Sequence, residues 1–254
     1  MSIDRLFDLS DDVAVVTGAG RGIGEGIAHV LSEAGAAVVL AARRGEEVER
    51  VAKTLRDLGR RAIAVPTDVT DDAAVEKLAE RAVSEFGSLD VWINNAGGSP
   101  VRAPLTEIAR EAWDAAIAVN LTAVWVCSVV AARRMGDGGR IVNISSLAGD
   151  GPMPGSGHYG AAKAGVNNLT ETLAVELGPR IRVNGIMPGA VPTEIMMTAL
   201  GLGDDDLPKL QKSLRLPLRR LGTPEDLGAA VLYLSAPASS WVTGQVLKVS
   251  GGMR

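Results

Sequence analysis

The 254-residue sequence predicts an α/β fold, namely a doubly wound parallel sheet of about seven strands with helices on both faces. Short runs of apolar, often β-branched residues alternate with longer segments of helical pattern along the whole chain. These short runs are apolar on both faces, as expected of strands buried within a parallel sheet. The first run leads directly into a glycine-rich turn and a helix, which is the context of a dinucleotide-binding motif.

The same patterns place the individual elements. The predicted strands are Val13–Thr17, Ala37–Ala41, Ala62–Pro66, Val91–Asn94, Arg140–Ile144, Arg180–Gly185 and Val246–Val249. The predicted helices are Ile23–Ala34, Glu46–Leu58, Asp71–Phe86, Trp113–Arg134, Tyr159–Leu177 and Pro224–Ser235. No linker, low-complexity tract or repeat divides the sequence, so we expect one domain over residues 1–254. Ligands of such sheets bind beyond the carboxyl ends of the strands, and the loops there are the expected functional regions.

The composition argues against several classes of protein. A net charge of −4 and a pI of about 5.3 provide no basic surface for nucleic acid or an anionic membrane. The single cysteine, Cys127, cannot form an internal disulfide, which fits a reducing cytosol. Residues 1–12 are acidic and lack the apolar core of a signal peptide. We therefore expect a cytoplasmic protein, and no metal site is predicted.

One segment approaches membrane-spanning length. Ala115–Ala132 is largely apolar and helical in pattern, but it contains Asn120, Thr122 and Ser128 and has charged residues on both sides. We interpret it as a buried core or subunit-interface helix, so no membrane partner is expected.

A glycine-rich segment, Thr17–Gly24, follows the first predicted strand and opens the first predicted helix. Its glycines permit positive φ angles, close approach of the backbone to a pyrophosphate, and tight contact between helix and strand. The amides and dipole at the helix N-terminus favour phosphate there. Glycines also make ordinary turns, but this strand–turn–helix context indicates dinucleotide binding. The residues expected to hold the cofactor here are Gly18, Gly20, Arg21, Gly22, Ile23 and Gly24.

The end of the second predicted strand bears on which dinucleotide binds. NAD sites place an Asp or Glu there for the ribose hydroxyls, whereas this chain has Ala42 followed by Arg43 and Arg44. Arg21, in the glycine segment, could reach the same place. Each charge-assisted contact to a 2′-phosphate contributes roughly 1.5–3 kcal/mol. These residues favour NADP(H). NAD(H) stays open, since the arginines could also be solvated surface side chains.

Tyr159 and Lys163 stand four residues apart, which puts a phenol and an ammonium on one face of a helix. The ordinary pKa of tyrosine is about 10, so it is a poor base at neutral pH unless a nearby positive charge favours the phenolate. An earlier predicted strand leads into Ser145 and Ser146, at the carboxyl edge of the sheet. A serine there can hold a substrate oxygen toward Tyr159, or it can be a turn or helix cap. Ser145 is the serine expected to be structural.

Further motifs follow in a fixed order. They are Asn94-Asn95-Ala96-Gly97, Asn120, Ser146, the Tyr159–Lys163 pair, Pro188-Gly189 followed by Thr193, Gly244-Gln245, and Gly251-Gly252. With these motifs the chain resembles the short-chain dehydrogenase/reductase family over nearly its whole length. Within that family it looks similar to bacterial 7α-hydroxysteroid dehydrogenases and to 3-oxoacyl-carrier-protein reductases.

The resemblance implies roles for these residues. Tyr159 would be the general acid of ketone reduction and the base of alcohol oxidation, and Lys163 would bind the nicotinamide ribose and lower the tyrosine pKa. Ser146 would hold the substrate oxygen, and Asn120 would anchor a water that relays protons to Lys163. The other implied cofactor contacts are Asp68, Val69, Asn95, Ala96, Gly97, Pro188, Gly189, Val191 and Thr193. Asn94, Asn95 and Gly97 could instead be turn residues, and Asp68 could cap the next helix.

The resemblance also implies where substrate and partners bind. Substrate specificity would lie in residues 190–216 and in the loop after Ser146, whose flexible apolar residues suit a steroid-like or 3-oxoacyl ketone or pack as a lid on the core. These residues are Met196, Met197, Leu200, Leu202, Leu207, Leu147, Met153 and Pro154. A carrier-protein partner would favour a basic patch, for which Arg133-Arg134 is a candidate, unless it is a solvated helix end. A homotetramer is implied, built on the helices that contain Trp125 and Val166 and on the C-terminal strand.

The sequence thus predicts an enzyme that moves a hydride between NADP(H) and a secondary alcohol or ketone. The alternative is a regulatory protein that keeps the fold and binds NAD(P) without chemistry. Such proteins are expected to lose the tyrosine or the lysine, and this chain retains Tyr159 and Lys163.

Overall fold

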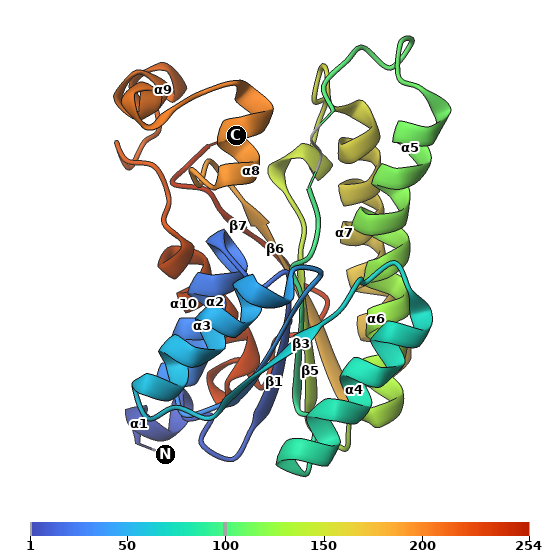
Figure 1. The fold of residues 1–254 in the computed structure, drawn as a ribbon, viewed down its shortest axis with the longest axis vertical. Coiled ribbons are helices and arrows are strands. Elements are labelled where there is room, and N and C mark those ends of the chain that lie inside the picture. Colours follow the sequence, from blue (N-terminus) through green and yellow to red (C-terminus); the bar gives the residue numbers. More distant parts are fainter. Residues whose placement is uncertain (1, 99–100, 254) are drawn as a thin grey trace.

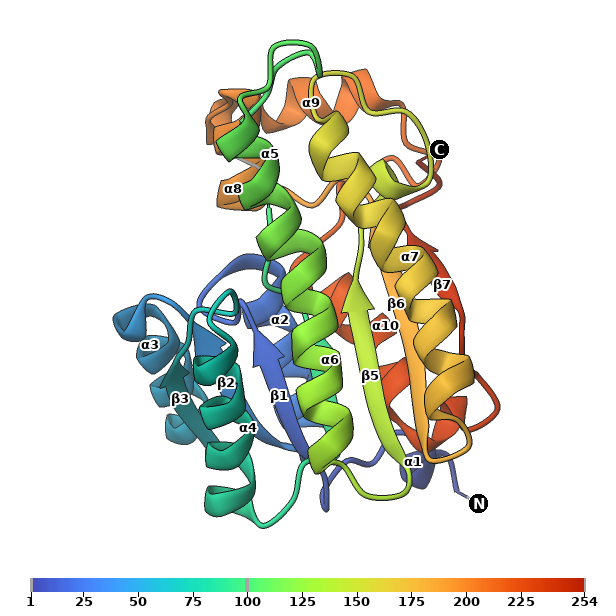
Figure 2. The ribbon, with the colours of Figure 1, turned by 90° about the vertical axis from the view of Figure 1, so that its right-hand side faces the viewer.

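The computed structural model describes residues 2–98 and 101–253, and Figures 1 and 2 show a central sheet with helices on both faces. All seven strands run parallel, in the order β3-β2-β1-β4-β5-β6-β7. They are β1 (Val13–Thr17), β2 (Ala37–Ala42), β3 (Ala62–Pro66), β4 (Val91–Asn94), β5 (Gly139–Ile144), β6 (Ile181–Pro188) and β7 (Val246–Val249). The predicted fold class is confirmed, and every predicted strand is present.

The helices form two layers (Figure 1). One layer contains α2 (Gly22–Glu33), α3 (Gly45–Asp57) and α10 (Pro224–Ser235), and the other contains α4 (Asp72–Phe86), α5 (Arg110–Ile117), α6 (Ala123–Arg134) and α7 (Gly157–Leu177). Successive strand residues serve opposite layers, since Ala14 and Val16 of β1 pack with α2 and α10 whereas Val13 and Val15 pack with α4 and α6. The strand order reverses between β1 and β4. The loops after these two strands therefore diverge and leave a crevice at the carboxyl edge.

The predicted helix Trp113–Arg134 is not continuous. Between α5 and α6 the chain forms a π-helical turn, Ala118–Thr122, in which the Ala123 amide donates to the Ala118 carbonyl. Such turns inside α-helices are frequent at functional sites. α5, the π-helical turn and α6 together make one helical stretch, Arg110–Arg134. By length and composition alone, this stretch is long and apolar enough to cross a membrane. Half of its most apolar window is buried, and α6 contributes to the core as predicted.

The segment after β6 contains helices that the sequence did not predict. They are α8 (Glu194–Leu200), a 3-10 turn at Asp204–Asp206 and α9 (Leu207–Leu214). The hydroxyl of Thr193 caps α8 by accepting a hydrogen bond from the Met196 amide at 3.3 Å. In Figures 1 and 2 these helices lie at the carboxyl end of the sheet, and Figure 1 shows them apart from α7. The remaining described elements are a short N-terminal helix, α1 (Ile3–Leu6), and 3-10 turns at Leu147–Gly149 and Pro237–Ser239.

A buried polar network connects the strands β4 and β5 to the helices α6 and α7. Trp92 donates from Nε1 to Asn94 Oδ1 at 2.8 Å, and Asn94 Nδ2 donates to Ser128 Oγ at 2.9 Å and to Asn143 Oδ1 at 2.8 Å. Asn143 in turn donates to Thr170 Oγ1 at 2.9 Å. All five side chains are buried. Removing one partner would leave buried polar groups unpaired, so the network fixes α6 and α7 against β4 and β5.

Candidate functional site

The glycine segment folds as a tight turn between β1 and α2. Gly18 and Gly22 have φ angles of 65° and 58°, a region that side chains disfavour. A Cβ at Gly24 would lie 2.2 Å from the Gly18 carbonyl oxygen, so only glycine lets the helix approach the loop this closely. The N-cap residue of α2, Arg21, makes no side-chain cap. The first amides of α2 therefore have no side-chain partner and suit an anion.

Asn95 and Thr17 lock the loop after β4 onto the glycine turn. The Asn95 side chain donates to the carbonyls of Thr17 at 2.9 Å and Gly18 at 3.1 Å. The Thr17 hydroxyl accepts from the amides of Asn95 and Ala96, both at 3.0 Å, and donates to the Ile93 carbonyl at 3.1 Å. Asn95 is thus more than a turn residue, since it holds both sides of the crevice together.

Asn120 and Lys163 both lie beside Gly97 and Gly98, the next residues of the loop after β4. Asn120 Oδ1 accepts from the Gly98 amide at 2.8 Å, and its Nδ2 donates to the carbonyls of Gly98 at 3.0 Å and Ala116 at 2.9 Å. A Cβ at Gly97 would lie 2.7 Å from Asn120 Oδ1 and 3.5 Å from Lys163 Nζ. The π-helical turn that contains Asn120 therefore positions the loop beside the lysine.

Tyr159 and Lys163 stand on the first turns of α7. Lys163 Nζ lies 5.7 Å from the centre of the Tyr159 ring and donates to the Ile144 carbonyl at 2.8 Å. Burial lowers the pKa of Lys163 to about 8. Burial also raises the pKa of the Tyr159 phenol, while a hydrogen bond with Ser146 acts in the opposite direction. In the chain without cofactor, the pKa of Tyr159 is therefore not lowered as expected, because the burial of the phenol has a larger effect than its favourable contacts.

The two serines after β5 have different surroundings. Ser145 is buried and donates from its hydroxyl to the Lys163 carbonyl at 3.1 Å. Ser146 is half-buried, its hydroxyl accepts from the Ala148 amide at 3.1 Å, and it hydrogen-bonds Tyr159. Ser146 therefore both caps the following turn and faces the tyrosine.

The three arginines predicted to contact the cofactor differ in their ion pairs. Arg21 forms an ion pair with Glu194, the first residue of α8, and so joins the glycine turn to the helices after β6. Arg44 pairs with Glu47 at 2.8 Å, whereas Arg43 is exposed just beyond β2. Arg43 forms no ion pair within residues 2–98 and 101–253, although its charge acts on the nearby Asp68 carboxyl.

Asp68-Val69 follows β3 on the same side as Arg43. The amide and hydroxyl of Thr70 donate to Asp68 at 3.0 and 2.7 Å and, together with the charge of Arg43, lower the pKa of the Asp68 carboxyl. Asp71, not Asp68, caps α4, so the capping alternative for Asp68 is wrong. Val69 is buried, which limits it to backbone contacts.

The segment from Pro188 to Thr193 lies over the glycine turn. The Gly189 amide donates to the Val249 carbonyl at 3.0 Å, and a Cβ at Gly189 would lie 2.6 Å from Ser250 Cα. Val191 is buried. The Thr193 methyl lies 3.1 Å from where a Cβ of Gly22 would be. These contacts bring this segment to the same edge of the sheet as the glycine turn, whereas Gly244-Gln245 precede β7 and lie at the opposite edge.

The apolar residues proposed to read the substrate divide into two groups. Met197 is buried within the structure, whereas Met153 and Leu200 stay exposed. Leu105 and Ile195, which the sequence did not indicate, are also exposed at this edge. Nothing in the sequence marked them, because their position depends on loops that are remote along the chain.

The basic pair Arg133-Arg134 does not form a free patch. Arg134 pairs with Glu76 and Glu80 at 3.2 and 3.0 Å, and Arg133 lies 3.8 Å from Glu76. The candidate surface for a carrier protein is thereby neutralised, and the solvated helix-end interpretation is favoured.

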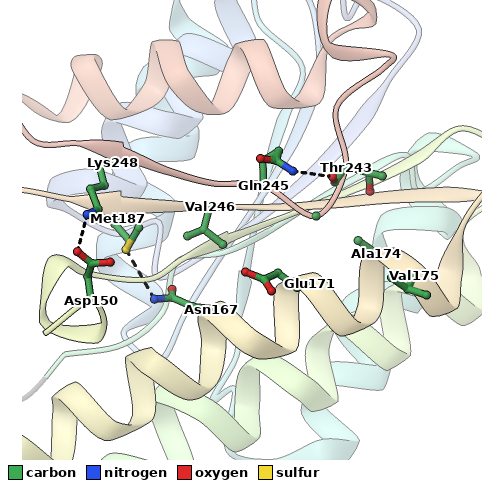
Figure 3. A pocket seen from close by; sticks show the side chains of 11 residues that line it. Asp150, Asn167, Glu171, Ala174, Val175, Met187, Thr243, Gln245, Val246 and Lys248 are labelled. Atoms are coloured by element: carbon green, nitrogen blue, oxygen red, sulfur yellow. Dashed lines mark hydrogen bonds and ion pairs between the residues drawn. The ribbon is translucent and has the colours of Figure 1, made fainter.

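An open groove of about 920 Å³ lies elsewhere, between α7 and β7 (Figure 3). Asn167 and Glu171 of α7 face Val246, and Asp150 closes one end by pairing with Lys248 at 2.5 Å. None of the predicted site residues lines this groove, so it is separate from the tyrosine.

Comparison with known proteins agrees with this arrangement. A family model described as "Enoyl-(Acyl carrier protein) reductase" matches residues 18–254. The chain is 44% identical over 246 residues to cis-4-hydroxycyclohexanecarboxylate dehydrogenase of Sinomonas cyclohexanicum, covering 96% of each protein. It is 35% identical over 252 residues to 7alpha-hydroxysteroid dehydrogenase of Escherichia coli K12, covering 96% of this chain and 94% of the relative.

A solved structure of a 7α-hydroxysteroid dehydrogenase, complexed with NADH and 7-oxo glycochenodeoxycholic acid, is similar with a TM-score of 0.91 and 34% identity. The match covers 100% of this chain and 98% of that one. The two relatives described above are named dehydrogenases of hydroxy compounds. The chain is therefore an oxidoreductase that belongs to the short-chain dehydrogenase/reductase family.

Proposed function

We propose that this enzyme moves a hydride between NADP(H) and a secondary alcohol or ketone, with Tyr159 as the acid/base group. The observation that carries the proposal is the juxtaposition of Tyr159, Ser146 and Lys163 beside the glycine turn at the carboxyl edge of the sheet. A nicotinamide dinucleotide fits this edge. The positive-φ glycines leave room for phosphate, and the amides that open α2 have no side-chain cap.

The bound cofactor supplies or accepts the hydride, and the chain's own residues handle the oxygen and its proton. In ketone reduction the Ser146 hydroxyl holds the carbonyl oxygen and the Tyr159 phenol donates its proton to it, as hydride reaches the carbonyl carbon. In alcohol oxidation the same proton returns to the tyrosine. Burial keeps the phenol neutral in the chain alone, which is the form that reduction requires.

Lys163 and Asn120 support the tyrosine. With a pKa of about 8, Lys163 is mostly protonated at neutral pH, and its charge faces the Tyr159 ring at 5.7 Å. It would also hold the nicotinamide ribose. Asn120 fixes Gly97 and Gly98 next to that ammonium and would keep a water near it.

Arg43 is the residue that would set the preference for NADP(H). It follows β2 directly, after Ala42 at the position where NAD sites place an Asp or Glu, and its own side chain is exposed there. We expect a higher kcat/KM with NADPH than with NADH, and we expect Arg43→Ala to raise KM for NADPH alone by about tenfold. An enzyme that prefers NADH, or an Arg43→Ala variant with unchanged KM for NADPH, would contradict this assignment.

The substrate is proposed to be a ring alcohol or ketone. Two similar proteins are named for such compounds, a hydroxycyclohexanecarboxylate and a hydroxysteroid. Exposed apolar side chains of Leu105, Met153 and Ile195 would contact an apolar ring system.

Tyr159→Phe tests the mechanism. It removes the proton donor while keeping the ring, so turnover of a cyclic ketone should fall at least 10³-fold. The Kd for NADPH, measured by fluorescence titration, should change less than about threefold. Near-normal turnover by this variant would refute the mechanism.

We also infer a homotetramer in the cytoplasm, as the family resemblance suggested. Val166 is fully buried, so α7 would contribute Val175, which is 83% exposed, alongside Trp125 of α6, which is 51% exposed. Size-exclusion chromatography with light scattering should give four copies, and a monomer would contradict this inference.

A further inference from the structure

We propose that Arg102 binds a carboxylate on the substrate, at the end remote from the reacting oxygen. The substrate class becomes a ring alcohol or ketone that carries an acid. This inference rests on the proposed function and deepens it by naming the group that the site recognises.

Arg102 belongs to a loop that covers the start of the catalytic helix. The Ala103 amide donates to the Gly155 carbonyl at 3.1 Å, and a Cβ at Gly155 would lie 3.7 Å from Arg102 Nη2. Leu105, on the same loop, lies 2.7 Å from where a Cβ of Gly157 would be. Gly155 precedes Tyr159 by four residues, a stretch of at most about 14 Å. The guanidinium therefore lies at the same end of α7 as the tyrosine.

The charge of Arg102 is left uncompensated. Within residues 2–98 and 101–253, no carboxylate forms an ion pair with Arg102 and no acceptor forms a hydrogen bond with its guanidinium. Nearby Arg110, by contrast, is held by Asp114 at 2.7 Å. A planar guanidinium with free donors at the mouth of a site matches the two oxygens of a carboxylate.

Exposed apolar side chains lie at the start of α7 and beside the loop after β4. Leu105 is 58% exposed and lies against Gly157, and Met153 is 43% exposed and lies beside Gly160. Ile195 of α8 is 40% exposed and lies 3.2 Å from a Cβ position on Gly98. Such side chains would contact the hydrocarbon ring of the substrate, and the substrate's carboxylate would bind Arg102. A ring with oxygen at one end and carboxylate at the other fits this polarity.

The test compares 4-oxocyclohexanecarboxylate with its neutral carboxamide as substrates, using wild type, Arg102→Leu, Arg102→Lys and Arg5→Leu. Arg5 is exposed on α1, at the opposite end of the sheet (Figure 1), and controls for the loss of one positive charge. We expect Arg102→Leu to raise KM for the acid at least about tenfold, with kcat nearly unchanged. KM for the carboxamide should stay the same, Arg102→Lys should recover part of the loss, and Arg5→Leu should behave as wild type.

Binding measured without turnover separates the two proposals. Titration calorimetry of the cofactor-free chain with cis-4-hydroxycyclohexanecarboxylate should give a Kd about tenfold weaker in Arg102→Leu than in wild type. If Arg102→Leu matches wild type in both KM and Kd for the acid, the inference is overturned, whatever the enzyme reduces. If wild type reduces no cyclic ketone but binding of the acid still depends on Arg102, the proposed function fails and the carboxylate site stands.

Discussion

Replacing Thr17 by valine would test whether one hydroxyl holds the two sides of the crevice together. Valine keeps the shape of threonine but removes Oγ1, which accepts from the Asn95 and Ala96 amides at 3.0 Å and donates to the Ile93 carbonyl at 3.1 Å. Each buried polar group that loses its partner costs about 1–3 kcal/mol. Asn95 and Ala96 are only half-buried, so water can reach their amides and the low end applies. We expect Thr17→Val to lower the free energy of unfolding by about 3 kcal/mol.

Thr17→Ser is the matched control. It keeps the hydroxyl and removes a buried methyl group, at a cost of about 1 kcal/mol. Urea unfolding followed by circular dichroism, at one protein concentration for all variants, should therefore rank wild type above serine and serine above valine. This order is the reverse of what side-chain volume alone would give. A valine variant as stable as the serine variant would refute the reasoning.

Three further perturbations follow from the site. Gly24→Ala would place a Cβ 2.2 Å from the Gly18 oxygen, and we expect a loss of about 3 kcal/mol or more by urea unfolding together with loss of NADPH binding. Below pH 8, Lys163 is charged in both folded and unfolded chains; between pH 8 and 10.5 only the unfolded chain stays charged. Wild-type stability relative to Lys163→Met should therefore rise across that window, and a pH-independent difference would contradict the burial argument. Glu194→Gln should change stability by less than about 1 kcal/mol, since its pair with Arg21 is exposed, yet lower the Kd for NADPH a few-fold; an unchanged Kd would show that the pair does not compete with the cofactor.

The parallel strands were predictable because each is a short apolar run buried on both faces, and the observed ends differ by at most a few residues. The π-helical turn was not predictable. It depends on Asn120 reaching Gly98, which lies on a loop 22 residues earlier. The helices α8 and α9 were missed for a related reason. They are short and capped by local hydrogen bonds, and Met197 is the only buried side chain among their described residues.

The motif residues of the candidate site converge at one edge because the strand order brings the ends of β1, β4 and β5 together. Arg102 carried no signal in the sequence, since a free arginine is distinguished only by the absence of a carboxylate around it in three dimensions. The pKa of Tyr159 was likewise beyond the sequence. The spacing to Lys163 indicated attraction, but the burial that opposes it is a property of the packed chain.

The buried network around Trp92 also gives the protein an internal optical reporter. Of the four tryptophans, Trp92 is fully buried with its indole N–H bonded to Asn94, whereas Trp241 is 98% exposed. An aqueous quencher such as iodide would reach Trp241 at once and Trp92 only after the sheet opens. The fraction of the emission that iodide quenches therefore reports on the outer surface, where copies would associate. The fraction that iodide does not quench reports on the folded interior that holds α7 in place.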